Sequence, residues 1–143
     1  MTAVAELYRA LVLDHGKRPR NVGHLAEATH AAEGENPLCG DAVRVEAVVA
    51  GGRIAAVRFS GDGCLLATAS ASLMTERMAG ARPGDLGTVL AALEAWCTRG
   101  PAAADVPPAL AEILAAFADV HRHPVRVGCA LLPWRTLARA LGI

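Results

Sequence analysis

Hydrophobic positions recur at two different periods along the chain, and the change of period separates predicted helices from predicted strands. The spacing near the N-terminus predicts a helix over residues 3–14. Its apolar stripe consists of Val4, Leu7, Tyr8 and Leu11. The segment HGKRPRNVG at residues 15–23 ends this pattern with one proline and two glycines. Residues 26–34 are ambiguous, with a short edge strand as one interpretation.

A regular alternation of apolar and polar residues predicts a β-hairpin in the middle of the chain. Its strands are DAVRVEAVV at residues 41–49 and RIAAVRF at residues 53–59. The register that places Val45 opposite Val57 brings the apolar side chains to one face and leaves a three-residue loop. A slip of one residue would oppose Val45 to Arg58. We therefore predict the first register.

Helical spacing returns after the hairpin and continues to the end of the chain. Four helices are predicted, at residues 65–80, 85–97, 109–121 and 129–141. The segment TRGPAAADVPP at residues 98–108 is predicted to be a linker within the domain rather than a domain boundary.

Two prolines set the predicted limits of the last helix. Pro124 in RHPVRV predicts an extended backbone before the helix. Pro133 has no amide hydrogen, so it is best tolerated near a helix start. We therefore place Cys129 at or beside the N-cap of that helix.

The composition indicates one globular domain, residues 1–143, with enough apolar surface for one core, since 53% of the residues are hydrophobic. No apolar run is long enough to span a membrane, and the N-terminus does not resemble a signal peptide, so we expect a cytoplasmic location. The 14 basic and 14 acidic side chains balance, which argues against nucleic acid as a partner. A local basic cluster, Lys17, Arg18 and Arg20, is interpreted as a solvated turn, with a docking surface as the alternative.

The four cysteines have no CxxC spacing, which argues against a zinc ribbon or finger, and a reducing compartment argues against structural disulfides.

In the predicted hairpin register Cys39 lies opposite Gly63, so the backbones of Cys39 and Cys64 should lie within roughly 5–8 Å. Asp41 projects to the same side as Cys39, since side chains alternate along an extended chain. Two thiols and one carboxylate are thus predicted to meet at the open end of the hairpin.

Cys64 and Cys129 each follow a glycine at the predicted start of a helix. A helix N-terminus favours the thiolate, the form that binds metal and attacks sulfur. Three thiolates and a carboxylate would suit tetrahedral zinc or an iron–sulfur cluster. Spacing alone leaves a shared site and three separately packed cysteines as equal alternatives.

The remaining cysteine and the histidines are weaker candidates for such a site. Cys97 ends an amphipathic helix and is interpreted as a small core residue. Solvated or capping roles are expected for His15, His24 and His30, and neither His121 nor His123 is a favoured ligand.

Four segments that include these residues resemble the U-type iron–sulfur cluster assembly proteins, the SufU/IscU family (NifU N-terminal-like). They are LYRALVLDHGKRPRNVGHL, NPLCGDAVRV, FSGDGCLLATASASLMTERMAG and HPVRVGCALLPWRTL. The resemblance places the family's site on Cys39, Asp41, Cys64 and Cys129, as metal ligands or cluster-binding residues. The SufU branch is favoured, because residues 83–108 resemble an insertion of SufU-like members. Gly128 stands where IscU-like members have histidine and SufU-like members usually have lysine.

The resemblance implies an α+β fold of the SufE/NifU-like type, with a small three-stranded antiparallel sheet and helices packed on one face. It also implies a zinc-dependent sulfur acceptor, which takes persulfide sulfur from a SufS-type cysteine desulfurase and works with downstream Suf proteins or acceptor apoproteins. Cys39 is our expected nucleophile, because a loop residue beside Gly40 moves more easily than one at a helix start. The alternative is a scaffold that assembles and transfers a [2Fe–2S] cluster on the same cysteines.

Overall fold

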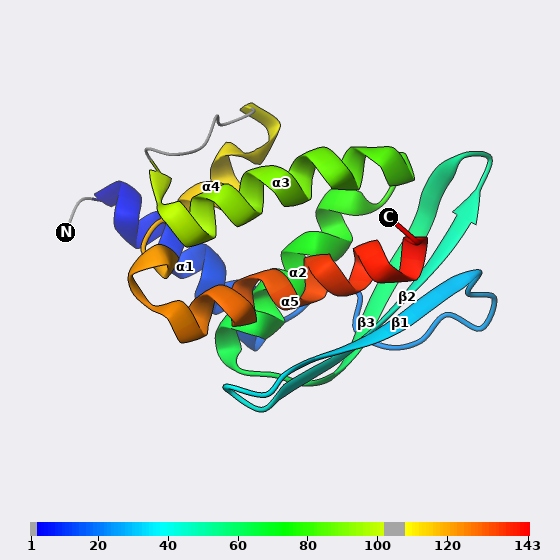
Figure 1. Ribbon diagram of the computed structural model, residues 1–143, viewed down its shortest axis with the longest axis horizontal. Helices are drawn as coiled ribbons and strands as arrows, with labels where there is room; N and C mark the ends of the chain where they lie inside the picture. Colours follow the sequence, from blue (N-terminus) through cyan, green and yellow to red (C-terminus); the bar gives the residue numbers. More distant parts are fainter. Residues whose placement is uncertain (1–2, 102–107) are drawn as a thin grey trace.

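The computed structural model describes residues 3–101 and 108–143, and it describes side chains from residue 9 onward. Figure 1 shows a sheet at one side of a group of helices. In chain order the elements are α1 (Ala3–Lys17), β1 (His30–Asn36), β2 (Asp41–Ala50), β3 (Arg53–Asp62), α2 (Leu65–Met78), α3 (Pro83–Arg99), the 3-10 helix η2 (Pro108–Leu110), α4 (Ala111–Ala116), the 3-10 helix η3 (Val120–Arg122) and α5 (Pro124–Leu141).

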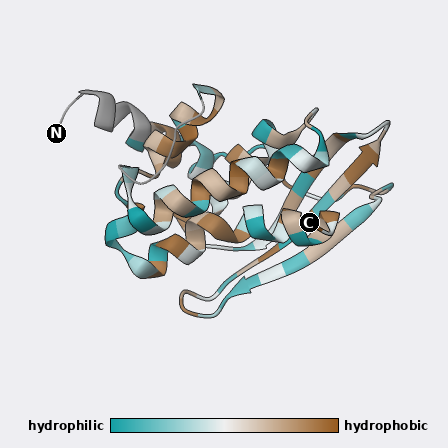
Figure 2. Cartoon of the chain, turned by 45° about the horizontal axis from the view of Figure 1, so that its top comes forward, coloured by the Kyte–Doolittle hydropathy of each residue, from teal (hydrophilic) through white to brown (hydrophobic). Residues whose placement is uncertain are grey.

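The three strands form one antiparallel sheet in the order β1-β2-β3, and helices cover one of its faces. Helix α5 packs on β1 and β2, and α2 packs on β3. The predicted α+β class is therefore confirmed. The ambiguous segment does contain an edge strand, β1, which is mostly hydrophilic or neutral in Figure 2.

The predicted hairpin forms, but from Ala42 to Val48 its register is wrong by two residues. Val45 pairs with Phe59 rather than Val57. The connection is the two-residue turn Gly51–Gly52, in which both glycines have positive φ, and a bulge lies between Val48 and Val49. The prediction assumed a longer loop and no bulge. Because the shift is even, the apolar side chains still share one face.

The last helix begins five residues earlier than predicted. Pro124 is its first residue, so the extended backbone predicted for RHPVRV is wrong. Proline suits a first helical position because that amide needs no helical partner. Pro133 instead lies inside the helix, where the Ser70 hydroxyl of α2 donates to the backbone carbonyl of Ala130.

The predicted helix at residues 109–121 is divided into η2, α4 and η3. The linker at residues 98–108 falls partly outside the described residues, as do the side chains of Val4, Leu7 and Tyr8.

The core lies between the covered face of the sheet and the helices. Val45, Ala47 and Val57 of the sheet belong to the same buried cluster as Trp96, Cys97 and Trp134 of the helices. None of the helices in the described residues is both long and apolar enough to cross a bilayer.

Candidate metal centre

The predicted site residues come from three places in the fold that lie toward the lower left of Figure 1. Cys39 lies in the turn between β1 and β2, and Asp41 is the first residue of β2. Cys64 directly precedes α2, and Cys129 lies in the second turn of α5.

The structure brings Cys39, Asp41 and Cys129 together. The sulfur of Cys39 lies 2.8 Å from Oδ2 of Asp41 and 2.9 Å from the sulfur of Cys129. One potential ligand atom from each of the three residues lies within 4.8 Å of the others. A sulfur 90 residues away in the chain thus reaches the pair that sequence reasoning placed together.

Cys64 lies beside this group. Its sulfur is 3.7 Å from Oδ2 of Asp41, and its side chain is exposed. As predicted, Cys64 stands at a helix N-terminus: it is the N-cap of α2, and its sulfur accepts a hydrogen bond from the Ala67 amide at 3.4 Å. Cys64 thus adjoins the group of potential metal ligands, but the structure does not include it in that group.

Asp41 is a carboxylate held in its charged form. Its side chain is buried, and burial by itself would raise its pKa. The hydrogen bonds from the Cys39 thiol and from the Cys64 amide, at 2.7 Å, outweigh burial, so the pKa of Asp41 lies below its ordinary value. An ionised carboxylate next to sulfur is what a zinc site of mixed ligands requires.

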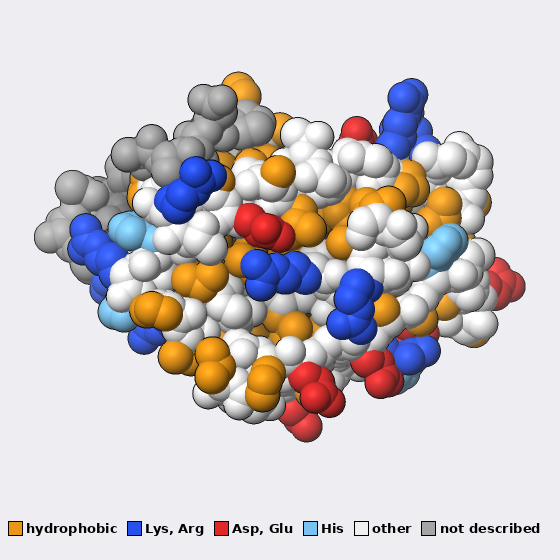
Figure 3. Space-filling model, in the orientation of Figure 1, with side chains coloured by type: hydrophobic (Ala, Val, Ile, Leu, Met, Phe, Trp, Pro, Cys, Tyr) orange, Lys and Arg blue, Asp and Glu red, His pale blue; other side chains and the backbone are white. Residues whose placement is uncertain are grey.

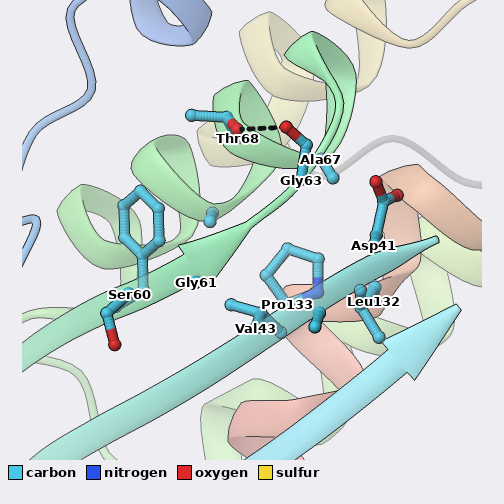
Figure 4. A pocket seen from close by; sticks show the side chains of 12 residues that line it. Asp41, Val43, Ser60, Gly61, Gly63, Ala67, Thr68, Leu132 and Pro133 are labelled. Carbon is cyan, nitrogen blue, oxygen red and sulfur yellow. Dashed lines mark hydrogen bonds between the residues drawn. The ribbon is translucent and has the colours of Figure 1, made fainter.

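Asp41 also lines a largely apolar pocket. Figure 4 shows Asp41 at one edge of this pocket, with Val43, Leu132 and Pro133 nearby and the Thr68 hydroxyl bonded to the Gly63 carbonyl. These apolar walls contribute to the burial that opposes ionisation of Asp41.

Cys129 does not stand at a helix N-terminus, contrary to the prediction. It is the sixth residue of α5 and only 2% exposed. The helix-dipole argument for its thiolate therefore does not apply. Burial, together with hydrogen bonds to Cys39 and Asp41, raises the pKa of Cys129 far above that of an ordinary thiol.

Sequence reasoning missed Asn36, which is 8% exposed. It contacts both Cys129 and the turn that bears Cys39. Its side-chain amide donates to the sulfur of Cys129, with Nδ2 and Sγ 3.6 Å apart. Its backbone carbonyl accepts from the amides of Cys39 and Gly40 at 3.2 and 2.9 Å. The only signal in the sequence was its place in NPLCGD.

Cys97 is fully buried in the core, as predicted, and burial raises its pKa to about 12. His15 is not solvated, contrary to the expectation: it is 4% exposed, and its Nδ1 lies 2.7 Å from the Ser72 hydroxyl. His24 pairs with Glu46 on the sheet. Within the described residues no histidine joins the group of potential metal ligands.

The donor atoms suit two kinds of group. Cysteine sulfur and an aspartate oxygen are ligands of tetrahedral zinc. Cysteine sulfurs also hold iron–sulfur clusters. The residues present therefore fit either a zinc ion or a cluster.

The chain is similar to proteins with known names. The family described as the NifU-like N-terminal domain matches residues 7–91. The chain is 32% identical over 135 residues to the iron–sulfur cluster assembly scaffold protein IscU of Thermotoga maritima, covering 94% of this chain and 92% of that protein. It is 32% identical over 136 residues to the zinc-dependent sulfurtransferase SufU of Bacillus subtilis, covering 94% and 89%.

Solved structures share the fold. A candidate scaffold protein for the SUF system from Fervidobacterium islandicum AW-1 superposes with a TM-score of 0.82 at 30% identity, over 92% of this chain and 93% of that chain. A NifU-like N-terminal protein from Brucella abortus has a TM-score of 0.83 at 23% identity, over 99% and 96%.

Proposed function

Because the chain belongs to the NifU-like N-terminal domain family of iron–sulfur cluster assembly proteins, we propose that it accepts persulfide sulfur at a zinc site formed by Cys39, Asp41, Cys64 and Cys129. We also propose that residues 1–143 form a single domain. The observation that carries the function is the convergence of Cys39, Asp41 and Cys129 within 4.8 Å. Bound zinc would keep the cysteine sulfurs deprotonated and sheltered from oxidation.

Cys39 is the proposed nucleophile. It lies in a turn and is only half-buried, whereas Cys129 is held inside a helix. Its thiolate attacks the outer sulfur of a persulfide on the partner's cysteine. The bond between the two persulfide sulfurs breaks, the partner's cysteine leaves as a thiolate, and Cys39 then carries the sulfur as a persulfide.

The proposed sulfur donor is a SufS-type cysteine desulfurase, and an apolar rim around the site is where we propose that it docks. We define this rim as Leu38, Leu65 and Val125, which are 76%, 41% and 47% exposed. The first two adjoin Cys39 and Cys64, and the backbone carbonyl of Val125 lies 3.5 Å from the sulfur of Cys129. Exposed apolar side chains grouped in this way are typical of protein interfaces.

A second candidate function is a scaffold that assembles a [2Fe–2S] cluster on the same cysteines and passes it to acceptor apoproteins. It is favoured by relatives such as the Thermotoga maritima protein, which is named a scaffold protein. Metal analysis of aerobically purified protein separates the two. Colourless protein with about one zinc supports the acceptor, whereas brown protein with iron and sulfide supports the scaffold.

Sulfur transfer from a persulfide-loaded desulfurase tests the acceptor directly. We expect the wild-type protein to gain one labelled sulfur, found on Cys39 by mass spectrometry. Cys39→Ser should stay folded and gain none, while Cys97→Ala, which changes a core cysteine, should gain sulfur like the wild type. Sulfur uptake by folded Cys39→Ser at the wild-type rate would contradict the assignment.

A further inference from the structure

Asn36 connects the turn that bears Cys39 to the helix that bears Cys129. Its Oδ1 accepts a hydrogen bond from the Leu38 amide at 3.3 Å, which fixes the orientation of the side-chain amide. The Nδ2 group then faces the sulfur of Cys129 at 3.6 Å. The residue is 8% exposed, so water competes little for these bonds.

Gly128 leaves the space that this amide occupies. A Cβ atom at position 128 would lie 2.6 Å from Nδ2 of Asn36, closer than real Cβ atoms approach, and 3.2 Å from Cγ, which is a tight contact. Any larger residue there would displace the amide. The side-chain amide of Asn36 therefore occupies the space that a side chain at position 128 would fill.

The sulfurs of Cys39, Cys64 and Cys129 differ in the N–H groups that donate hydrogen bonds to them. The sulfur of Cys129 accepts a hydrogen bond from the side-chain amide of Asn36, and the sulfur of Cys64 accepts one from the backbone amide of Ala67. The hydrogen bonds of Cys39 in the described residues join its sulfur to two oxygens, of Asp41 and of the Asn36 backbone, and to the Cys129 sulfur. An N–H donor withdraws charge from a thiolate and holds it in place.

We propose that Asn36 is a positioning residue, which uses the space left by Gly128 to anchor Cys129 as a fixed ligand and so leaves Cys39 as the reactive sulfur. This inference rests on the proposed zinc site. It gives Gly128 a role, which is to leave space for the Asn36 amide, and it explains why the cysteines would differ in reactivity.

Three variants test the proposal on the zinc-loaded protein. Asn36→Asp keeps the shape and the acceptor for Leu38 but removes the N–H donor. Gly128→Ala keeps Asn36 but displaces its amide. Gly87→Ala is the matched control, because that helical glycine has open space around its Cβ position.

The measurements are the rates of alkylation at each cysteine, mapped by mass spectrometry, and zinc affinity by competition with a chelator. Among the three cysteines of the site, we expect Cys39 to react first and Cys129 last in the wild type. In Asn36→Asp and Gly128→Ala, alkylation of Cys129 should become several-fold faster, and zinc affinity should fall by roughly 10- to 100-fold. Gly87→Ala should match the wild type in both.

The proposal is overturned if both variants fold and keep the wild-type zinc affinity and protection of Cys129, or if the wild-type protein does not bind zinc. Failure of the proposed function looks different. A protein that keeps this alkylation order but takes no sulfur from a desulfurase would refute sulfur acceptance and leave the role of Asn36 intact.

Discussion

At the scale of single residues, the burial of Cys97 predicts how it reacts. Because its pKa is raised to about 12, only about one molecule in ten thousand carries the thiolate at pH 8. We expect iodoacetamide to leave Cys97 unmodified in the native, chelator-treated protein and to modify it fully in guanidinium. Peptide mass spectrometry would measure this, with the half-exposed Cys39 as the internal reference. Equal native rates for Cys97 and Cys39 would contradict the core assignment.

Part of the site could be predicted at this scale and part could not. The contact between Cys39 and Asp41 was predicted from their two-residue spacing in an extended chain, but the structure makes it with Cys39 in a turn and Gly40 at positive φ. Asn36 could not be assigned a role in the same way. Its partner Cys129 is 93 residues away, and the contact depends on how α5 crosses the sheet.

At the scale of elements, a buried histidine joins α1 to α2. His15 bonds to Ser72 and lies 3.6 Å from Glu76. Burial lowers its pKa below 6.5, and the charge of Arg20 acts in the same direction, against the opposite effects of Glu76, Asp14 and Glu112. The neutral imidazole is thus the form that fits between the helices.

This arrangement predicts a dependence of stability on pH. Because the pKa of His15 is lower in the folded state, its contribution is fully present above about pH 6.5 and is lost as pH falls through the folded pKa. We expect the free energy of unfolding to decrease between about pH 7.5 and about pH 5.5, and to decrease less in His15→Asn. Urea denaturation of metal-free protein would measure it, since zinc affinity also changes with pH.

The matched control is His123→Asn, which removes an exposed histidine and should keep the wild-type difference between the two pH values. If His15→Asn and the wild type lost the same stability on acidification, the buried imidazole would not be the cause.

The elements also show where sequence patterns reach their limit. Apolar alternation predicted both hairpin strands, but an even shift leaves that alternation unchanged, so it could not reveal the bulge at Val48/Val49. The start of α5 was missed for a different reason. Pro124 is compatible with an extended segment and with a first helical position, and only packing distinguishes the two.

At the scale of the whole molecule, the fold separates a reactive end from a remote one. The turn between β1 and β2 and the starts of α2 and α5 lie toward the lower left of Figure 1, and the C-terminus lies to the right of centre, at the far end of α5. Figure 3 shows hydrophobic side chains gathered at the lower left, over the start of α5 and the turn between β1 and β2. A partner that delivers sulfur to Cys39 would have to contact this end.

The apolar rim of Leu38, Leu65 and Val125 therefore predicts a selective binding defect. Leu38 is 76% exposed and adjoins Cys39, so a charge at this position would be desolvated in the complex at little cost to folding of the free protein. We expect Leu38→Asp to weaken binding to the desulfurase by about tenfold or more, with unchanged zinc content. Ile143→Asp is the control, because Ile143 is also exposed, at 57%, but lies at the remote C-terminus. Isothermal titration calorimetry with each variant would measure the affinity, and an equal loss in both would mean that general surface charge, rather than the rim, determines binding.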